Sequence, residues 1–110
     1  MKEAVFSPDL QHKVSFGSYE ISMSHWIDQP YLIRISDDAC LFDLSEEAWS
    51  ASTVRWFNDS TVELYLRKYP GLIDCTLVLN ILTNQAEVVS RTNSVAGTFS
   101  AVNEWILNLK

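Results

Sequence analysis

Polar and apolar residues alternate along much of this chain, which is the pattern of strands that bury one face. The clearest segments are residues 19–25 and 61–68. In the second segment Val62, Leu64 and Leu66 share one side, and threonine, glutamate, tyrosine and arginine occupy the other. A period of two places successive side chains on opposite faces of a sheet. We therefore predict half-buried antiparallel strands in both segments.

Further apolar runs, each bounded by turn residues, predict the remaining strands. These runs cover residues 14–16, 31–35, 39–43, 53–57, 75–82 and 86–90. The run 75–82 is apolar on both faces and predicts a central strand. Gly17-Ser18 and residues 28–30 predict interruptions, and the acidic residues 36–38 predict a hairpin turn. Residues 45–49 predict one short helical turn that begins at a serine cap.

The hydrophobic period changes near the C-terminus. Phe99, Val102, Ile106 and Leu109 recur at intervals of three and four residues. This spacing predicts an amphipathic helix of about ten residues that packs on one face of the sheet. The complete pattern predicts a mostly β (α+β) fold, namely an antiparallel meander of seven or eight strands with one C-terminal amphipathic helix.

Two short segments resemble each other. Residues 6–9 (Phe-Ser-Pro-Asp) and 57–60 (Phe-Asn-Asp-Ser) each precede a series of strands and turns. They resemble the turn that opens each blade in β-propeller repeats of the periplasmic-translocation type. Because two units cannot close a propeller, the resemblance implies a meander built from blade-like sheets, and it implies no function.

Length and composition predict one folded domain. A chain of 110 residues has room for a single globular domain, 1–110, and its 47% hydrophobic and 20% charged residues are typical of folded proteins. No apolar run approaches the ~18 residues of a membrane span, and the N-terminus lacks a signal-peptide core. We therefore expect a cytoplasmic protein, with Cys40 and Cys75 as buried thiols.

The negative charge is concentrated in one third of the chain. The segment from Asp28 to Glu63 contains eight acidic residues and only two basic ones, Arg34 and Arg55, so it accounts for the whole formal net charge of −6. A sequence pI near 4.7 disfavours nucleic-acid and membrane-surface binding, because both need basic patches. An acidic surface attracts basic partners instead.

The sequence lacks the spacing patterns of common catalytic and metal sites. The two histidines, His12 and His25, show no zinc-site spacing with the cysteines, and the acidic turns lack the glycine and final glutamate of a calcium loop. No serine is flanked by glycines as in a nucleophile elbow, and the three glycines form no phosphate loop. We therefore expect no catalytic residues, metal or cofactor.

Trp26 is the strongest candidate for a binding residue. It falls on the polar face of its predicted strand, and an exposed tryptophan among acids has the properties of an interface hot spot. Trp49 is the second candidate anchor, with burial in the core as its alternative. The complete set of predicted partner-binding residues is Trp26, Asp28, Asp37, Asp38, Asp43, Glu46, Glu47 and Trp49.

These observations predict a non-catalytic module that binds a basic protein. A small acidic domain without catalytic motifs is similar in general character to bacterial immunity proteins, and this resemblance implies an inhibitor that covers a cationic toxin or nuclease. The alternative is a small-ligand or carbohydrate module that stacks its ligand on Trp26, Tyr31, Tyr65 or Tyr69. An unrecognised enzyme and a homodimer through edge strands stay open.

Overall fold

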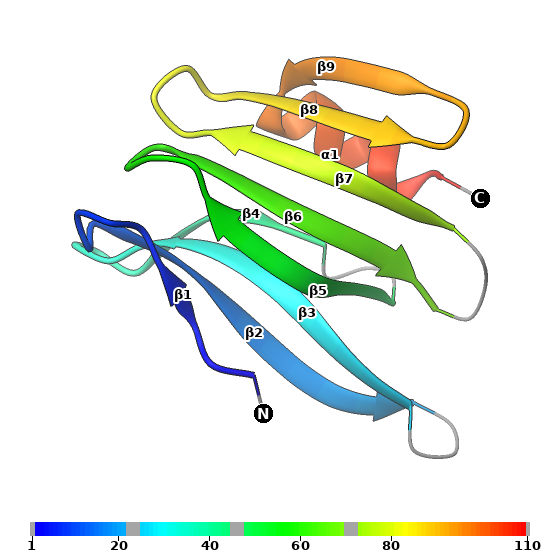
Figure 1. Ribbon diagram of the computed structural model, residues 1–110, viewed down its shortest axis with the longest axis horizontal. Coiled ribbons are helices and arrows are strands. Elements are labelled where there is room, and N and C mark those ends of the chain that lie inside the picture. Colours follow the sequence, from blue (N-terminus) through cyan, green and yellow to red (C-terminus); the bar gives the residue numbers. More distant parts are fainter. Residues whose placement is uncertain (1, 22–24, 45–47, 70–72, 110) are drawn as a thin grey trace.

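The residues that the structure describes form two antiparallel sheets and one helix (Figure 1). The computed structural model describes residues 2–21, 25–44, 48–69 and 73–109. The first sheet has the order β1-β2-β3-β4 and the second β5-β6-β7-β8-β9. Their bounds are Val5–Phe6, His12–Ile21, His25–Arg34 and Ala39–Asp43 for β1 to β4, and Trp49–Trp56, Thr61–Lys68, Asp74–Asn80, Gln85–Ser90 and Ser94–Thr98 for β5 to β9. The helix α1 spans Phe99–Leu107.

The predicted fold class is confirmed. Every strand pairs antiparallel with its neighbour in the chain inside each sheet, as a meander requires. The predicted turn at residues 36–38 is also present, and Asp38 in this turn and Asn84 in the β7–β8 turn adopt positive φ values of 57° and 54°. Aspartate and asparagine tolerate this left-handed conformation better than most other residues, which explains why these turns are tight.

Two predicted interruptions are wrong, because strands run through them. Gly17 and Ser18 lie inside the ten-residue strand β2, and residues 28–30 lie inside β3. The Asp28 backbone N–H points away from β2 and donates to Ser50 Oγ of β5 (3.0 Å). Alternate residues of a strand direct their N–H groups to the same edge, so an N–H at position 30 would also point away from β2. The proline at this position therefore removes no hydrogen bond between β3 and β2.

In strand β6 the buried and exposed faces are those predicted from the sequence. Val62, Leu64 and Leu66 are buried, with exposed fractions of 2% or less, while Tyr65 on the opposite face is 41% exposed. On the buried side of this sheet, α1 presents Phe99, Val102 and Ile106 to the core cluster to which Val62, Leu64 and Leu66 also belong. The predicted amphipathic helix is therefore confirmed.

The helix α1 follows directly after an edge strand that the sequence pattern does not predict. Thr98 caps its N-terminus by accepting a hydrogen bond from the Ala101 N–H (3.2 Å). The five residues before the helix form the edge strand β9, which the sequence pattern does not reveal because its residues are small and largely exposed. The two-residue strand β1 is likewise too short to show the alternation that predicts a strand.

The two sheets share one hydrophobic core. Buried residues of the first sheet, such as Val14 and Leu32, belong to the same cluster as the inward residues of the second sheet and α1. The Trp56 indole N–H donates to the Val5 carbonyl oxygen (3.0 Å), so β1 and β5 are also joined by a hydrogen bond. No helix within the described residues is long and apolar enough to cross a membrane.

The two cysteines lie in different sheets and are both free thiols. Cys75 on β7 is buried as predicted, and burial raises the pKa of its thiol to about 12. Cys40 on β4 is exposed, so the prediction of two buried thiols is wrong for this residue. It lies at the edge strand of the smaller sheet, where fewer neighbours cover it.

Candidate functional site

Trp26 and Asp28 meet in a hollow on one face of the β2–β3 hairpin. Trp26 is 61% exposed, and the two residues are two positions apart on β3, so their side chains share a face. They line a hollow of about 390 Å³ together with Ser18 and Lys2. In the β2–β3 register Glu20 stands opposite Trp26. The structure therefore places an exposed indole beside two carboxylates, and we call the four lining residues together with the neighbouring Glu20 the Trp26 hollow.

The carboxylate of Asp28 has a fixed position in this hollow. The Ser18 hydroxyl donates to its Oδ1 atom (2.7 Å) from the directly opposite position on β2. The backbone of Asp28 is held from the other side by Ser50 of β5 (3.0 Å). Because both strands constrain it, Asp28 presents its charge beside Trp26 without needing to reorganise when a ligand arrives.

A cation of the chain itself already occupies one side of the hollow. The Lys2 ammonium donates to the carbonyl oxygens of Ala51 (2.7 Å) and Ser52 (2.8 Å). It also lies 5.1 Å from the centroid of the Phe16 ring, within the range of a cation–π contact. Carbonyl oxygens and an aromatic face thus already hold a positive charge in this region, beside the carboxylate of Asp28.

The other predicted acidic residues do not join this hollow. Asp37 and Asp38 lie in the β3–β4 turn, at the opposite end of β3 from Trp26 (Figure 1). Asp43 pairs with Tyr31, an odd-numbered residue of β3, and so lies on the opposite sheet face from Trp26 and Asp28. Glu46 and Glu47 lie outside the described residues. The residues predicted to form one acidic face are therefore distributed over separate surfaces.

Asp37 is also less available as a free charge than its position in the sequence indicates. The Arg34 guanidinium donates to both of its carboxylate oxygens, at 3.0 and 2.8 Å, and the Ala39 N–H donates to one of them (3.2 Å). These contacts, the one from Arg34 first, lower the pKa of Asp37 from its ordinary value of 3.8 to about 2. The pair is exposed to solvent, so its contribution to stability is small.

We expect Arg34→Gln to raise the pKa of Asp37 toward its ordinary value. A lowered pKa contributes stability that is present above pH 3.8 and is lost as the pH falls toward 2, and the variant should lose that dependence. An NMR titration of the Asp37 carboxyl carbon measures the change. Arg55→Gln, in the other sheet, is the control and should leave the midpoint in place. An equal midpoint in the wild type and Arg34→Gln would contradict the assignment.

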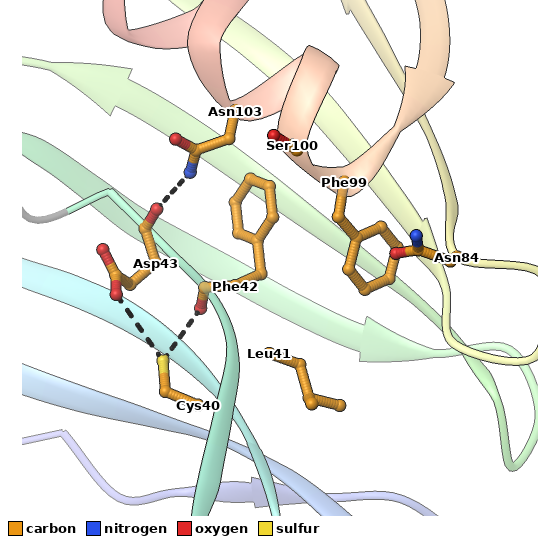
Figure 2. A pocket seen from close by; sticks show the side chains of 8 residues that line it. All are labelled: Cys40, Leu41, Phe42, Asp43, Asn84, Phe99, Ser100 and Asn103. Carbon is orange, nitrogen blue, oxygen red and sulfur yellow. Dashed lines mark hydrogen bonds between the residues drawn. The ribbon is translucent and has the colours of Figure 1, made fainter.

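Asp43 borders a second hollow, of about 410 Å³, between β4 and the first turn of α1 (Figure 2). The Phe42 and Phe99 rings pack edge to face beneath it, with their centroids 6.0 Å apart. Asn103 donates to the Asp43 carbonyl oxygen, and the Cys40 sulfur lies 3.6 Å from an oxygen of the Asp43 carboxylate. Burial and the charge of Asp43 raise the pKa of the Cys40 thiol, which favours the neutral thiol.

Trp49 is not a surface anchor, which corrects the prediction. Its side chain is fully buried at the start of β5, in the core shared by the two sheets. Its large apolar surface is stabilising there, although its indole N–H has no hydrogen-bond partner among the residues that the structure describes. The alternating pattern around residue 49 is too short to reveal which way this side chain points.

Two of the tyrosines named in the carbohydrate alternative, Tyr31 and Tyr65, do not lie beside Trp26. The Tyr31 ring lies over Gly17, on the opposite face of β3 from Trp26. Tyr65 lies on the second sheet, where its hydroxyl donates to Asp74 Oδ2 (2.9 Å). A ligand that stacks on Trp26 would therefore contact neither Tyr31 nor Tyr65 in the same hollow.

Sequence reasoning missed Glu20, Ser18 and Lys2 as parts of the Trp26 hollow. Glu20 and Ser18 are both assigned to β2, and their alternation with Tyr19 and Ile21 is visible in the sequence. What is not visible is the register that places them opposite Trp26 and Asp28. Among the described residues no group of histidine, cysteine and acidic side chains is arranged to hold a metal ion.

The chain shows no match to any family model, to any curated protein or to any solved structure with which it was compared. The resemblances to immunity proteins and to propeller blade turns stay predictions. The functional interpretation therefore depends on the geometry of the hollow and on its charge.

Proposed function

We propose that this protein is a non-catalytic binding module that captures a basic protein partner through the Trp26 hollow. The observation that carries the proposal is the 61% exposure of Trp26 beside Glu20 and Asp28 on the β2–β3 hairpin. Large aromatic side chains are usually buried, and exposed tryptophans at interfaces are frequent hot spots. The flanking carboxylates select for positive charge.

The ligand element that fits the hollow is an arginine or lysine side chain of the partner. A guanidinium or ammonium over the Trp26 ring gains a cation–π contact, and the carboxylates of Asp28 and Glu20 supply ionic hydrogen bonds. The formal net charge of −6 adds long-range attraction, which accelerates association with a basic protein. The finer form of the proposal, an immunity-type inhibitor, adds that the partner is a cationic toxin or nuclease that is blocked by the complex.

We expect Trp26→Ala to weaken binding to a basic peptide by about 30-fold or more, because truncating a hot-spot tryptophan removes about 2 kcal/mol or more. A fluorescent oligo-arginine peptide is the probe, and anisotropy at low salt is the measurement. Glu20→Gln combined with Asp28→Asn should weaken binding similarly and reduce its dependence on salt. Phe57→Ala is the matched control, since Phe57 is 49% exposed and belongs to the β5–β6 turn.

The same variants decide between the proposed function and the carbohydrate alternative. Peptide binding that Trp26→Ala and Phe57→Ala weaken equally would contradict the Trp26 hollow as the binding site. Binding to a glycan array that persists at high salt and is lost in Trp26→Ala would favour a carbohydrate ligand, since stacking is little screened. For the immunity form, the wild type should inhibit a nuclease retained on the immobilised protein, and Trp26→Ala should inhibit it more weakly.

A further inference from the structure

The second sheet carries another hollow, on the face opposite α1. Three of the four arginines of the chain belong to the second sheet or its turns, and two of them, Arg67 and Arg91, line one hollow of about 270 Å³. The other lining residues are Ser52, Tyr65 and Asp74. Two guanidinium groups in one hollow are an unexpected concentration of positive charge in a chain whose net charge is −6.

The strand register brings these residues together. Arg67 on β6 stands directly opposite Asp74 on β7. Cys75 pairs with Ser90, so Arg91 at the end of β8 comes level with Asp74 from the other side. Asp74 therefore lies between the two arginines, although the three residues come from different strands and a turn.

A β-bulge adds a hydroxyl group to this hollow. Ala51 pairs with Leu66 and Thr53 pairs with Tyr65, which leaves Ser52 as the extra residue of β5. A bulge redirects the side chain of the unpaired residue, and bulges are frequent beside binding sites. Here the redirected residue lines the hollow with Tyr65 and Arg67.

Asp74 holds the Arg91 side chain in position but balances only one of the two positive charges in the hollow. Its carboxylate accepts from the Tyr65 hydroxyl (2.9 Å) and from Arg91 Nε and Nη2 (3.4 and 3.3 Å). These contacts, that of Arg91 first, lower the pKa of Asp74, so it stays charged and holds Arg91 in place. The Arg67 guanidinium makes no hydrogen bond within the described part of the chain, and the hollow keeps an excess of one positive charge.

We propose that this hollow binds a small oxyanion of the phosphate class. The donors are the Arg67 guanidinium, the Arg91 N–H groups that do not face Asp74, and the Ser52 hydroxyl. Planar guanidinium groups donate pairs of parallel hydrogen bonds to phosphate oxygens, which a lysine cannot do. The site uses side-chain donors and needs no glycine-rich loop, and its single excess charge suits one anion and not a nucleic-acid backbone.

Titration with inorganic phosphate at constant ionic strength tests the proposal, with NMR shifts of the β6 and β8 amides as the readout. We expect saturable binding with a dissociation constant on the order of 1 mM. Arg67→Gln should weaken it about tenfold, because it removes the donor fork and the excess charge. Arg55→Gln is the matched control. It removes the same charge from β5, but Arg55 pairs with Glu63 (3.4 Å) and does not line the hollow.

A second variant and a second probe complete the test. Ser52→Ala keeps every charge and should weaken binding several-fold through the lost hydroxyl. O-phosphoserine distinguishes the source of the anion, since tighter binding than inorganic phosphate would indicate a phosphorylated side chain and equal binding would indicate the free ion. The proposal is overturned if neither probe saturates, or if Arg55→Gln weakens binding as much as Arg67→Gln does.

Discussion

Leu64→Asp is expected to unfold the domain. Leu64 is 2% exposed at the centre of β6, among the inward residues that pack against β7, β5 and α1. The substitution loses about 2–5 kcal/mol of leucine packing, and it buries a carboxylate without a partner at a cost of several kcal/mol more. A domain of this size is stable by only about 5–15 kcal/mol, so the sum approaches or exceeds the whole stability.

The matched control is Val89→Asp on the same sheet. Val89 lies on β8 and is 47% exposed, so its aspartate stays in water and should change the melting temperature little. Circular dichroism and thermal melting of the two variants provide the comparison. A normal melting curve for Leu64→Asp would mean that the faces of β6 are reversed, which corresponds to a shift of one residue in the register.

Trp49→Ala is expected to cost about 3–5 kcal/mol of the free energy of unfolding. The side chain is completely buried where the first residue of β5 enters the shared core, and its removal leaves a large cavity. Trp49→Phe should cost much less. The phenyl ring keeps most of the packing, and the substitution eliminates a buried indole N–H that has no hydrogen-bond partner within the described part of the chain.

Urea unfolding of both variants measures these differences, provided that the slope of free energy against urea stays constant. Trp26→Ala is the control, because a side chain that is 61% exposed contributes little to the core. Its expected wild-type stability also ensures that the loss of binding by this variant is not caused by unfolding. A Trp49→Ala variant within about 1 kcal/mol of the wild type would contradict the assignment of Trp49 to the core.

The two proposed sites use opposite charges on different sheets. The Trp26 hollow lies on the β2–β3 hairpin and presents carboxylates beside an indole, whereas the hollow at Arg67 lies on the second sheet and presents guanidinium groups. Their tests are independent, because no residue lines both hollows. The negative net charge of the chain therefore does not predict the sign of the charge at each hollow.

The pattern of apolar and polar residues predicts the fold class, the faces of β6 and the buried face of the helix. Alternation with a period of two identified Val62, Leu64 and Leu66 as inward residues, and the change of period identified Phe99, Val102 and Ile106 as the buried face of a helix. These features are local, because the pleat of a strand and the turn of a helix fix the direction of each side chain relative to its near neighbours. Trp26 is exposed as predicted, but the single strand predicted over residues 19–25 is wrong, because β2 ends at Ile21 and β3, which carries Trp26, begins at His25.

Which side chains lie next to one another depends on strand pairing and on the packing of the two sheets, and the residue pattern does not contain this information. The sequence shows acidic residues close together between Asp28 and Glu63, yet the hairpins place Asp28, Asp37 and Asp43 on separate surfaces. Conversely, Glu20 meets Trp26, and Arg67 meets Asp74, only through the strand register. The burial of Trp49 and the strand that continues through Pro30 depend in the same way on neighbouring strands. The physical reason is that local periodicity sets the face of a side chain, while cross-strand pairing and the packing of the two sheets set its neighbours.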